Sequence, residues 1–170
     1  MIITKKTKLR EVIPLITNKN IEYLLEQTPA VEYKSILSMT ICEFDELVSN
    51  ESDYIETHII RRERYFLQAF GKIKHLRAQM EQLNKFIGRF ERKSTAEENQ
   101  AKRGVLFPSL VQRMLIDVTK FFGLKSFDEA EKVKVADWLL VFQNEAATNL
   151  FNYNLQKIFE QKAKLKQRKK

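Results

Sequence analysis

Residues 59–90 read IIRRERYFLQAFGKIKHLRAQMEQLNKFIGRF, and their apolar side chains recur at steps of three and four. This spacing predicts an amphipathic α-helix, because side chains three and four residues apart share one helical face. With its polar flanks included, the pattern predicts one long helix over residues 54–92 in an a/d heptad register. The face consists of Ile59, Arg62, Phe66, Ala69, Ile73, Leu76, Met80, Leu83, Ile87 and Phe90, of which only Arg62 is polar.

This apolar face has two interpretations. It is either the core face of a long helix in an antiparallel bundle, or a coiled-coil seam that binds a partner. We favour the core face, which suits a chain of 170 residues with 44% hydrophobic content and a core of its own. Gly71 and Gly88 lie off the face, and each costs about 1 kcal/mol relative to Ala inside a helix. Close approach of another helix is the explanation that the sequence suggests for them.

A second long helix is predicted near the other end of the chain. Ser126 to Glu129 matches a capping box, and helical periodicity continues from there to about Leu165 without a Gly or Pro. Both predicted long helices measure about 57–60 Å at 1.5 Å per residue, and an elongated helical hairpin requires such matched lengths. The apolar stripe of the second helix comprises Val135, Trp138, Leu139, Phe142, Ala146, Leu150, Tyr153 and Ile158.

Residues 105–122, between the two long helices, are apolar on more than one face. They predict a helix that begins at Pro108 and is ended by Gly123. We expect it to be the most buried element, packed on one side of the hairpin. The polar residues 93–104 before it predict a loop.

The N-terminal part of the chain predicts several short helices, and the polar residues 49–53 end this series. The start signals are Thr7 for residues 8–13, Asn18 or Asn20 for 21–26, Thr28-Pro29 for 30–38, and a capping box from Thr40 to Glu43 for 41–48. Only 4 Gly and 3 Pro occur, which argues against a turn-rich β fold. The predicted fold is all-α: an elongated helical hairpin or bundle of two long helices plus one buried helix, with short N-terminal helices.

The net charge of +8 is unevenly distributed. Residues 1–56 carry 6 basic and 10 acidic side chains (−4), residues 57–103 carry 12 and 5 (+7), and residues 104–170 carry 12 and 7 (+5). We divide the chain into an acidic region of short helices at 1–53, a long-helix body at 54–165 and a basic tail at 166–170. A chain with such opposite ends can bind nucleic acid, or it can stack head to tail on copies of itself.

No motif predicts a catalytic, cofactor-binding or metal-binding site. His58 and His75 are far apart, and neither has a second His or a Cys at i+3 or i+4. Four single Gly cannot form a phosphate-binding loop. Cys42, the only cysteine, predicts a half-buried side chain in a reducing, cytosolic protein, and its acidic neighbours disfavour a thiolate. No stretch approaches the ~20 apolar residues of a membrane span, and the start lacks an apolar signal region.

Cations along the first long helix and at the C-terminus raise nucleic acid binding as an alternative. Base stacking would need aromatic side chains on an exposed basic face, whereas the aromatic residues here follow the apolar stripes. Solvated helix faces are therefore the favoured explanation of the cations. The candidate phosphate contacts are Arg61, Arg64, Lys72, Lys74, Arg77, Lys162, Lys164, Lys166, Arg168, Lys169 and Lys170.

Three stretches are suggestive when taken together: Leu9-Arg-Glu-Val-Ile-Pro14, Thr40-Ile-Cys-Glu-Phe-Asp-Glu-Leu47, and Phe127-Asp-Glu-Ala-Glu followed by Trp138-Leu-Leu-Val-Phe142. In these stretches and in its general pattern the chain resembles the small helical structural and assembly proteins of tailed bacteriophages. The resemblance transfers no site residue. It implies a virion component or a morphogenesis chaperone that acts through protein contacts, in the host cytoplasm or in the virion.

The predicted function is therefore that of a non-enzymatic, protein-binding structural or assembly component of a larger complex. Its expected partners are copies of itself or other assembly proteins, and we expect no membrane association and no cofactor. The alternative is a basic helical nucleic-acid-binding or packaging accessory protein.

Overall fold

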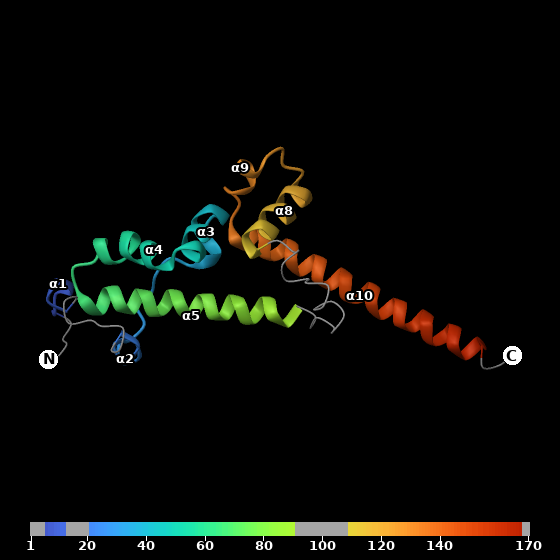
Figure 1. Cartoon of the computed structure of the whole chain (residues 1–170), viewed down its shortest axis with the longest axis horizontal. Helices are drawn as coiled ribbons and strands as arrows, with labels where there is room; N and C mark the ends of the chain where they lie inside the picture. Colours follow the sequence, from blue (N-terminus) through green and yellow to red (C-terminus); the bar gives the residue numbers. More distant parts are fainter. Residues whose placement is uncertain (1–5, 13–20, 91–108, 168–170) are drawn as a thin grey trace.

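The computed structural model describes residues 6–12, 21–90 and 109–167. All named elements in these ranges are helical, which confirms the predicted all-α class. Figure 1 shows α3 and α4 on one side of α5, α2 on its other side, and α10 projecting away from the body. The elements are α1 (Leu9–Val12), α2 (Ile21–Gln27), the 3-10 turn η2 (Ile36–Ser38), α3 (Ile41–Ser49), α4 (Glu51–His58), the 3-10 turn η3 (Ile60–Arg62), α5 (Phe66–Phe90), α8 (Leu110–Phe122), α9 (Phe127–Ala130) and α10 (Val135–Gln167).

The predicted first long helix is interrupted between α4 and α5. After the turn η3 the backbone is extended at Glu63, with φ −103° and ψ 137°. The N-terminal segment pairs with this break: Leu9 N–H donates to the Arg64 carbonyl, and Phe66 N–H donates to the Thr7 carbonyl, both at 3.0 Å. These bonds satisfy backbone groups that a continuous helix would have paired internally. The chain folds back, so that α4 lies alongside α5 and both contribute to one core.

From Phe66 onward most of the predicted apolar face of α5 is buried in the core of the protein. Met80 is half-buried, and Arg62 and Phe90, near the two ends of the predicted face, are exposed. The buried members of the face are Ile59, which lies before the break, and Phe66, Ala69, Ile73, Leu76, Leu83 and Ile87 on α5.

The segment between α2 and η2 is extended, so the helix predicted to begin at Thr28 is absent apart from the single turn η2. Thr28 instead closes α2, because its hydroxyl donates to the Leu24 carbonyl at 2.7 Å. Side chains of α5 hold the segment: Lys74 Nζ donates to the Thr28 carbonyl at 2.9 Å, and Gln79 Oε1 accepts from Ile36 N–H at 2.8 Å. These tertiary hydrogen bonds replace those that a local helix would make.

Gly71 lies where the extended segment crosses α5. Val31 N–H donates to the Gly71 carbonyl at 3.0 Å. A Cβ at Gly71 would lie 2.5 Å from Val31 Cγ2 and 2.8 Å from the Pro29 carbonyl oxygen. The predicted close approach is therefore present, although it is made by an extended segment and not by a helix. Gly88, by contrast, has open space where its Cβ would lie.

The predicted second long helix is also interrupted, because a short segment separates α9 from α10. Ser126 caps α9 as predicted, and its side chain accepts from Glu129 N–H. The separating segment makes an antiparallel bridge with the residues before α3, where Ile41 N–H donates to the Val133 carbonyl at 2.9 Å. A local sequence pattern does not contain this pairing, since its two partners lie far apart in the chain.

Helix α8 begins at Leu110, with Ser109 and Gln112 forming a capping box. Gly123 ends it as predicted, in the left-handed conformation at φ 64°. The expectation that this is the most buried element is wrong, because α8 lies at the surface and covers the core with one face only. Val111, Met114 and Val118 are buried on that face, while Ile116, Phe121 and Phe122 are exposed. The predicted loop at 93–104, Pro108 and Ile13 lie outside the described residues.

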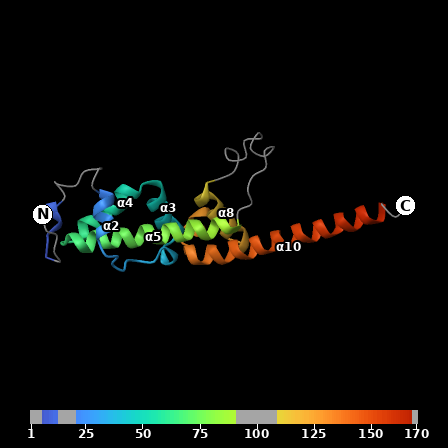
Figure 2. The ribbon, with the colours of Figure 1, turned by 90° about the horizontal axis from the view of Figure 1, so that it is seen from below.

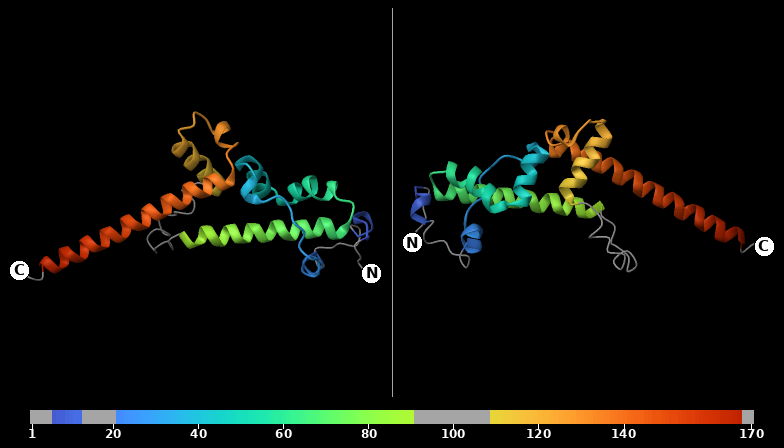
Figure 3. Two further views of the ribbon diagram at one scale, coloured as in Figure 1. Left: turned by 180° about the vertical axis from the view of Figure 1, so that it is seen from behind. Right: turned by 45° about the horizontal axis from the view of Figure 1, so that its top comes forward.

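Helices α5 and α10 do not lie side by side along their lengths, as a hairpin would require. They meet near the C-terminal end of α5, where the rings of Phe90 and Phe142 are in T-shaped contact with centroids 5.8 Å apart. Beyond this contact α10 leaves the body, as Figures 1 and 3 show. Only the first half of the apolar face predicted for the second long helix is buried. Val135, Trp138 and Phe142 are buried, whereas Leu150, Tyr153 and Ile158 are exposed.

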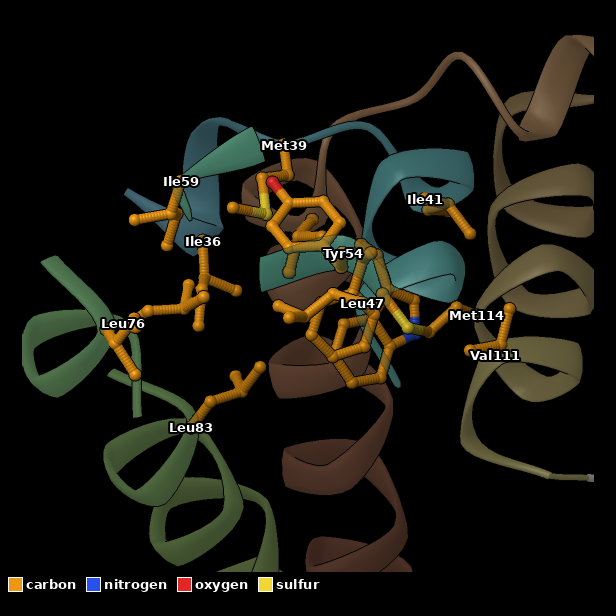
Figure 4. Packing of buried hydrophobic residues seen from close by; sticks show 14 of the residues in the cluster. Ile36, Met39, Ile41, Leu47, Tyr54, Ile59, Leu76, Leu83, Val111 and Met114 are labelled. Carbon is orange, nitrogen blue, oxygen red and sulfur yellow. The ribbon is translucent and has the colours of Figure 1, made fainter. Parts of the chain in front are cut away.

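One hydrophobic core joins the short helices to the long ones. Figure 4 shows side chains of η2, α3, α4, α5 and α8 converging around the start of α10. The acidic region at 1–53 contributes Ile41, Phe44 and Leu47 to this core. Figure 2 shows the same body from below, with α10 extending beyond it. Among the helices in the described ranges, none combines the length and the apolarity that crossing a membrane needs.

Candidate functional site

Within the described ranges, no group of three or more His, Cys, Asp or Glu side chains is placed to hold a metal ion. His58 packs on its own helix, where its ring stacks on Tyr54 with centroids 4.4 Å apart. His75 is half-buried on α5. Both histidines therefore sit in the packed body of the protein.

An open cavity of about 320 Å³ lies where the N-terminal segment meets η3 and the residues before α5. Its one carboxylate, Glu63, is ion-paired with Lys72 at 2.5 Å. The wall is otherwise cationic and apolar, so its chemistry suits a small anion better than acid–base catalysis by two carboxylates. The lining residues are Lys8, Leu9, Arg10, Ile60, Glu63 and Arg64.

Cys42 lies on α3 and is exposed, not half-buried as predicted. Partial desolvation raises the pKa of its thiol, and the carboxylates of Glu131 and of Glu46 raise that pKa further. The acidic neighbours thus disfavour the thiolate as predicted, although desolvation is the larger cause.

The five cations of the body that were predicted as phosphate contacts each have a partner within the chain. Most of these contacts join α5 to the elements that pack around it, so the cations help to hold the fold together. The partners are Glu56 for Arg61 (2.9 Å), Glu63 for Lys72 (2.5 Å), Glu51 for Arg77 (2.8 Å), the Glu26 and Thr28 carbonyls for Lys74 (3.0 and 2.9 Å), and the Tyr65 ring for Arg64 (5.8 Å).

The other predicted phosphate contacts belong to the C-terminal end of the chain. Lys162 and Lys164 are exposed on α10. Lys166 is part of α10, but its side chain lies outside what the structure describes. Arg168, Lys169 and Lys170 lie outside the described residues.

The most unusual surface of the protein is the C-terminal half of α10. Every residue from 147 to 162 is exposed. The large apolar side chains among them are Leu150 (60% exposed), Phe151 (65%), Tyr153 (46%), Leu155 (36%), Ile158 (46%) and Phe159 (60%). No described element packs on this part of the helix, although six of its residues are large and apolar.

Most of these apolar side chains share one side of α10. A helix turns by about 100° per residue, so Leu150, Phe151, Leu155, Ile158 and Phe159 fall within one half of its circumference. Asn152, Gln156 and Glu160 fall on the other half together with Tyr153, whereas Asn154, Gln161 and Lys162 lie on the same half as the apolar side chains. Leu140, which is 65% exposed, lies earlier on α10 and on the apolar side. We call Leu140, Leu150, Phe151, Leu155, Ile158 and Phe159 the α10 stripe.

The α10 stripe and the buried face of α10 lie on opposite sides of the helix. Val135, Trp138 and Phe142 point into the body, and by helical geometry they lie roughly 175° from the centre of the stripe. Leu140 is exposed, whereas Val141 beside it is buried and has the same helical angle as Phe159. The core therefore covers one edge of the stripe side where α10 leaves the body.

The sequence interpretation missed the stripe because it assigned a single packing face to this helix. That predicted face joined Trp138 and Phe142 to Leu150 and Ile158, which point in different directions. The sequence does contain a signal for this change of side. When the residues before and after about position 146 are placed on separate helical wheels, the apolar residues gather on different sides.

The charges of α10 are divided along its length. Between residues 135 and 156 the only charged residues are Asp137 and Glu145, a net −2. Residues 157–167 carry four Lys and one Glu, a net +3. Acids near the N-terminus and bases near the C-terminus suit the helix dipole, and they also give the two ends of α10 opposite charge.

A second group of exposed apolar side chains lies around the end of α8. Ile116, Phe121, Phe122 and Phe127 are each about half exposed, and the rings of Phe121 and Phe122 contact each other with centroids 5.2 Å apart. This group is spread over α8 and α9, whereas the α10 stripe follows one continuous helix.

Compared with known proteins, the chain matches no family model, and neither a curated protein nor a solved structure matches it significantly.

Proposed function

We propose that this chain is a non-enzymatic, protein-binding component of a larger assembly. The observation that carries the proposal is the α10 stripe, on which no described element packs. At about 200 Å² for a fully exposed large side chain, Leu150, Phe151, Leu155, Ile158 and Phe159 expose roughly 530 Å². The largest apolar patch of a typical monomeric protein is about 300–600 Å² and is often functional. The contiguous part of the stripe thus reaches the upper part of this range.

A helix that presents one apolar face suits recognition through helix packing, in which spaced apolar side chains anchor the partner. The second half of α10 also lacks contacts with the other described elements, although tertiary packing supplies most of the stability of helices in proteins. A bound partner would cover the stripe and stabilise this part of α10 at the same time. The body of the protein, with its own core, would then serve to hold and orient the helix.

The resemblance of the sequence to small helical proteins of tailed bacteriophages suggests a setting for this binding. We propose that the chain is a virion component or a morphogenesis protein, and that its partners are copies of itself or other assembly proteins.

The proposal is tested by comparing two double variants of the native protein. Phe151→Gln with Ile158→Gln removes two anchors of the stripe, and Asn152→Ala with Gln156→Ala changes the opposite side of the same helix turns. Tagged forms are purified from the native source, and mass spectrometry identifies the proteins that accompany them. We expect the stripe variant to lose partners that the wild type and the control variant retain. Identical partner sets for all three proteins, or no partner for the wild type, would contradict the proposal.

The alternative, a basic helical nucleic-acid-binding or packaging accessory protein, has less support. The five candidate cations of the body are engaged with partners in the chain. Among the described side chains, only Lys162 and Lys164 remain from the predicted set. The salt dependence of any DNA binding separates the two functions, because contacts with phosphates weaken steeply as the salt concentration rises.

A further inference from the structure

We infer that the α10 stripe is the contact surface between two copies of this chain, paired as antiparallel helices about a two-fold axis near residues 154 and 155. The inference rests on the proposed protein-binding function and identifies the partner as a second copy.

The size of the stripe agrees with what a stable dimer needs. Leu150, Phe151, Leu155, Ile158 and Phe159 of two paired copies would bury about 1,070 Å² of apolar surface in total, at about 200 Å² for each fully exposed side chain. A specific interface should bury at least about 1,000 Å² of total surface. A two-fold interface uses the same patch on both copies, and one apolar stripe along one straight helix is such a self-complementary patch.

The charge pattern of α10 determines the direction of pairing. A parallel pair would place the net +3 of residues 157–167 beside the same residues of the second copy. With an axis between residues 154 and 155, an antiparallel pair places residues 157–167 beside residues 142–152 of the other α10, whose only charged residue is Glu145. The lysines of the two copies are thereby kept apart, so the antiparallel direction is electrostatically favoured.

The register follows from the distribution of the apolar side chains. Leu150, Phe151, Leu155, Ile158 and Phe159 are centred between residues 154 and 155. An axis at this point gives the largest apolar overlap and places Phe151 of one copy beside Ile158 of the other. The same symmetry places Ala147 beside Lys162 of the second copy.

Among the described residues, the stripe is open from Leu150 to Phe159, where every residue of α10 is exposed. Nearer the body, Val135, Trp138 and Phe142 pack on the face opposite the stripe, and Val141 is buried at one edge of the stripe side. In an antiparallel pair the two bodies lie at opposite ends of the helix pair.

The first experiment measures oligomeric state by size-exclusion chromatography with light scattering over a range of protein concentrations. We expect a mass of twice 20.2 kDa for the wild type. Phe151→Gln with Ile158→Gln should raise the dimer dissociation constant by about 100-fold or more, because buried central anchors carry most of the binding energy. The control variant, Asn152→Ala with Gln156→Ala, should remain dimeric. Trp138 fluorescence and circular dichroism verify that each variant retains its folded body.

The second experiment tests direction and register by disulfide formation in a Cys42→Ser background. A mixture of two singly substituted proteins, Ala147→Cys and Lys162→Cys, should cross-link as a heterodimer when oxidised. Neither protein alone should cross-link efficiently, because the antiparallel pair separates identical positions.

These outcomes separate the inference from the proposed function. A wild type that is monomeric at all concentrations, or a dimer that survives the stripe substitutions, overturns the pairing of two copies. Efficient cross-linking of Lys162→Cys to itself overturns the antiparallel direction. In each of these cases the proposed function stands if the stripe variant still loses other protein partners in the comparison described above, and it fails if that comparison shows no loss.

Discussion

The indole Nε1–H of Trp138 donates a hydrogen bond to Oδ2 of Asp117 at 3.0 Å, and this bond joins α10 to α8. Trp138 is completely buried, and its ring stacks on that of Phe142 with centroids 5.3 Å apart. A buried tryptophan normally finds an acceptor for its N–H group. The side chain thus combines apolar packing with one directed polar contact at the point where α10 enters the core.

Substitutions at these two residues should separate the packing contribution from the hydrogen bond. Trp138→Ala should lower the free energy of unfolding by roughly 3–5 kcal/mol, since it empties a fully packed site. Asp117→Ala should lower it by about 1–3 kcal/mol, because the indole N–H is left buried without an acceptor. Urea unfolding followed by circular dichroism measures both values. A neutral Asp117→Ala variant, or tryptophan emission typical of an indole in water, would contradict this description of the core.

Two glycines of α5 should respond in opposite ways to alanine. At Gly71 a new Cβ would meet Val31 and the Pro29 carbonyl within 3 Å, so the extended segment must shift. We expect Gly71→Ala to destabilise the protein by about 1–3 kcal/mol. Gly88 is exposed with open space around it, and Gly88→Ala should stabilise by up to about 1 kcal/mol through helix propensity. Equal changes in the melting temperature of the two variants would show that the extended segment does not lie in close contact with Gly71.

Glu43 should contribute a measurable pH dependence to stability. The hydrogen bond from Lys34 lowers the pKa of Glu43 below its ordinary 4.5, in spite of some desolvation, and the Thr40 N–H adds to this effect. A carboxylate with a lowered folded-state pKa stabilises the protein above the unfolded-state pKa, and this stabilisation is lost as the pH falls through the folded-state value.

The wild type should therefore exceed Glu43→Gln in stability by a constant amount above about pH 4.5, and the difference should shrink below that pH. Urea unfolding at a series of pH values measures it. Glu81→Gln, which removes a fully exposed pair with Lys85, is the control, and its effect should be small at every pH. A stability difference between the wild type and Glu43→Gln that grows as the pH falls would show that the pKa of Glu43 is not lowered in the folded protein.

Nucleic acid binding should be weak, independent of sequence and sensitive to salt. Binding releases counterions, with a slope near −0.9 in log affinity against log salt for each neutralised phosphate of duplex DNA. Deleting residues 162–170 removes six cations, so both the affinity and the slope should fall, while the binding of protein partners through the centre of the stripe should largely persist. Tight DNA binding at physiological salt that this deletion abolishes would favour the packaging alternative over the proposed function.

Much of the local structure could be read from the sequence. The capping box at Thr40, the cap at Ser126 and the terminating Gly123 lie where they were predicted, because each depends on a few neighbouring residues. The apolar face beginning at Phe66 was also identified as core, since its period was maintained through α5. The candidate site could be predicted only in part, because the sequence identifies the apolar residues of α10 but not their exposure.

The amino-acid sequence by itself determined that this protein is helical, where several of its helices begin and end, and which face of α5 is apolar. These properties arise from hydrogen bonds and side-chain spacing within one or two helical turns. Only the tertiary structure decided where the long helical patterns break and which side of α10 stays open. The breaks are held by bonds between distant residues, such as Leu9 with Arg64 and Ile41 with Val133. The exposure of the α10 stripe depends on what packs beside the helix, and a one-dimensional pattern does not carry that information.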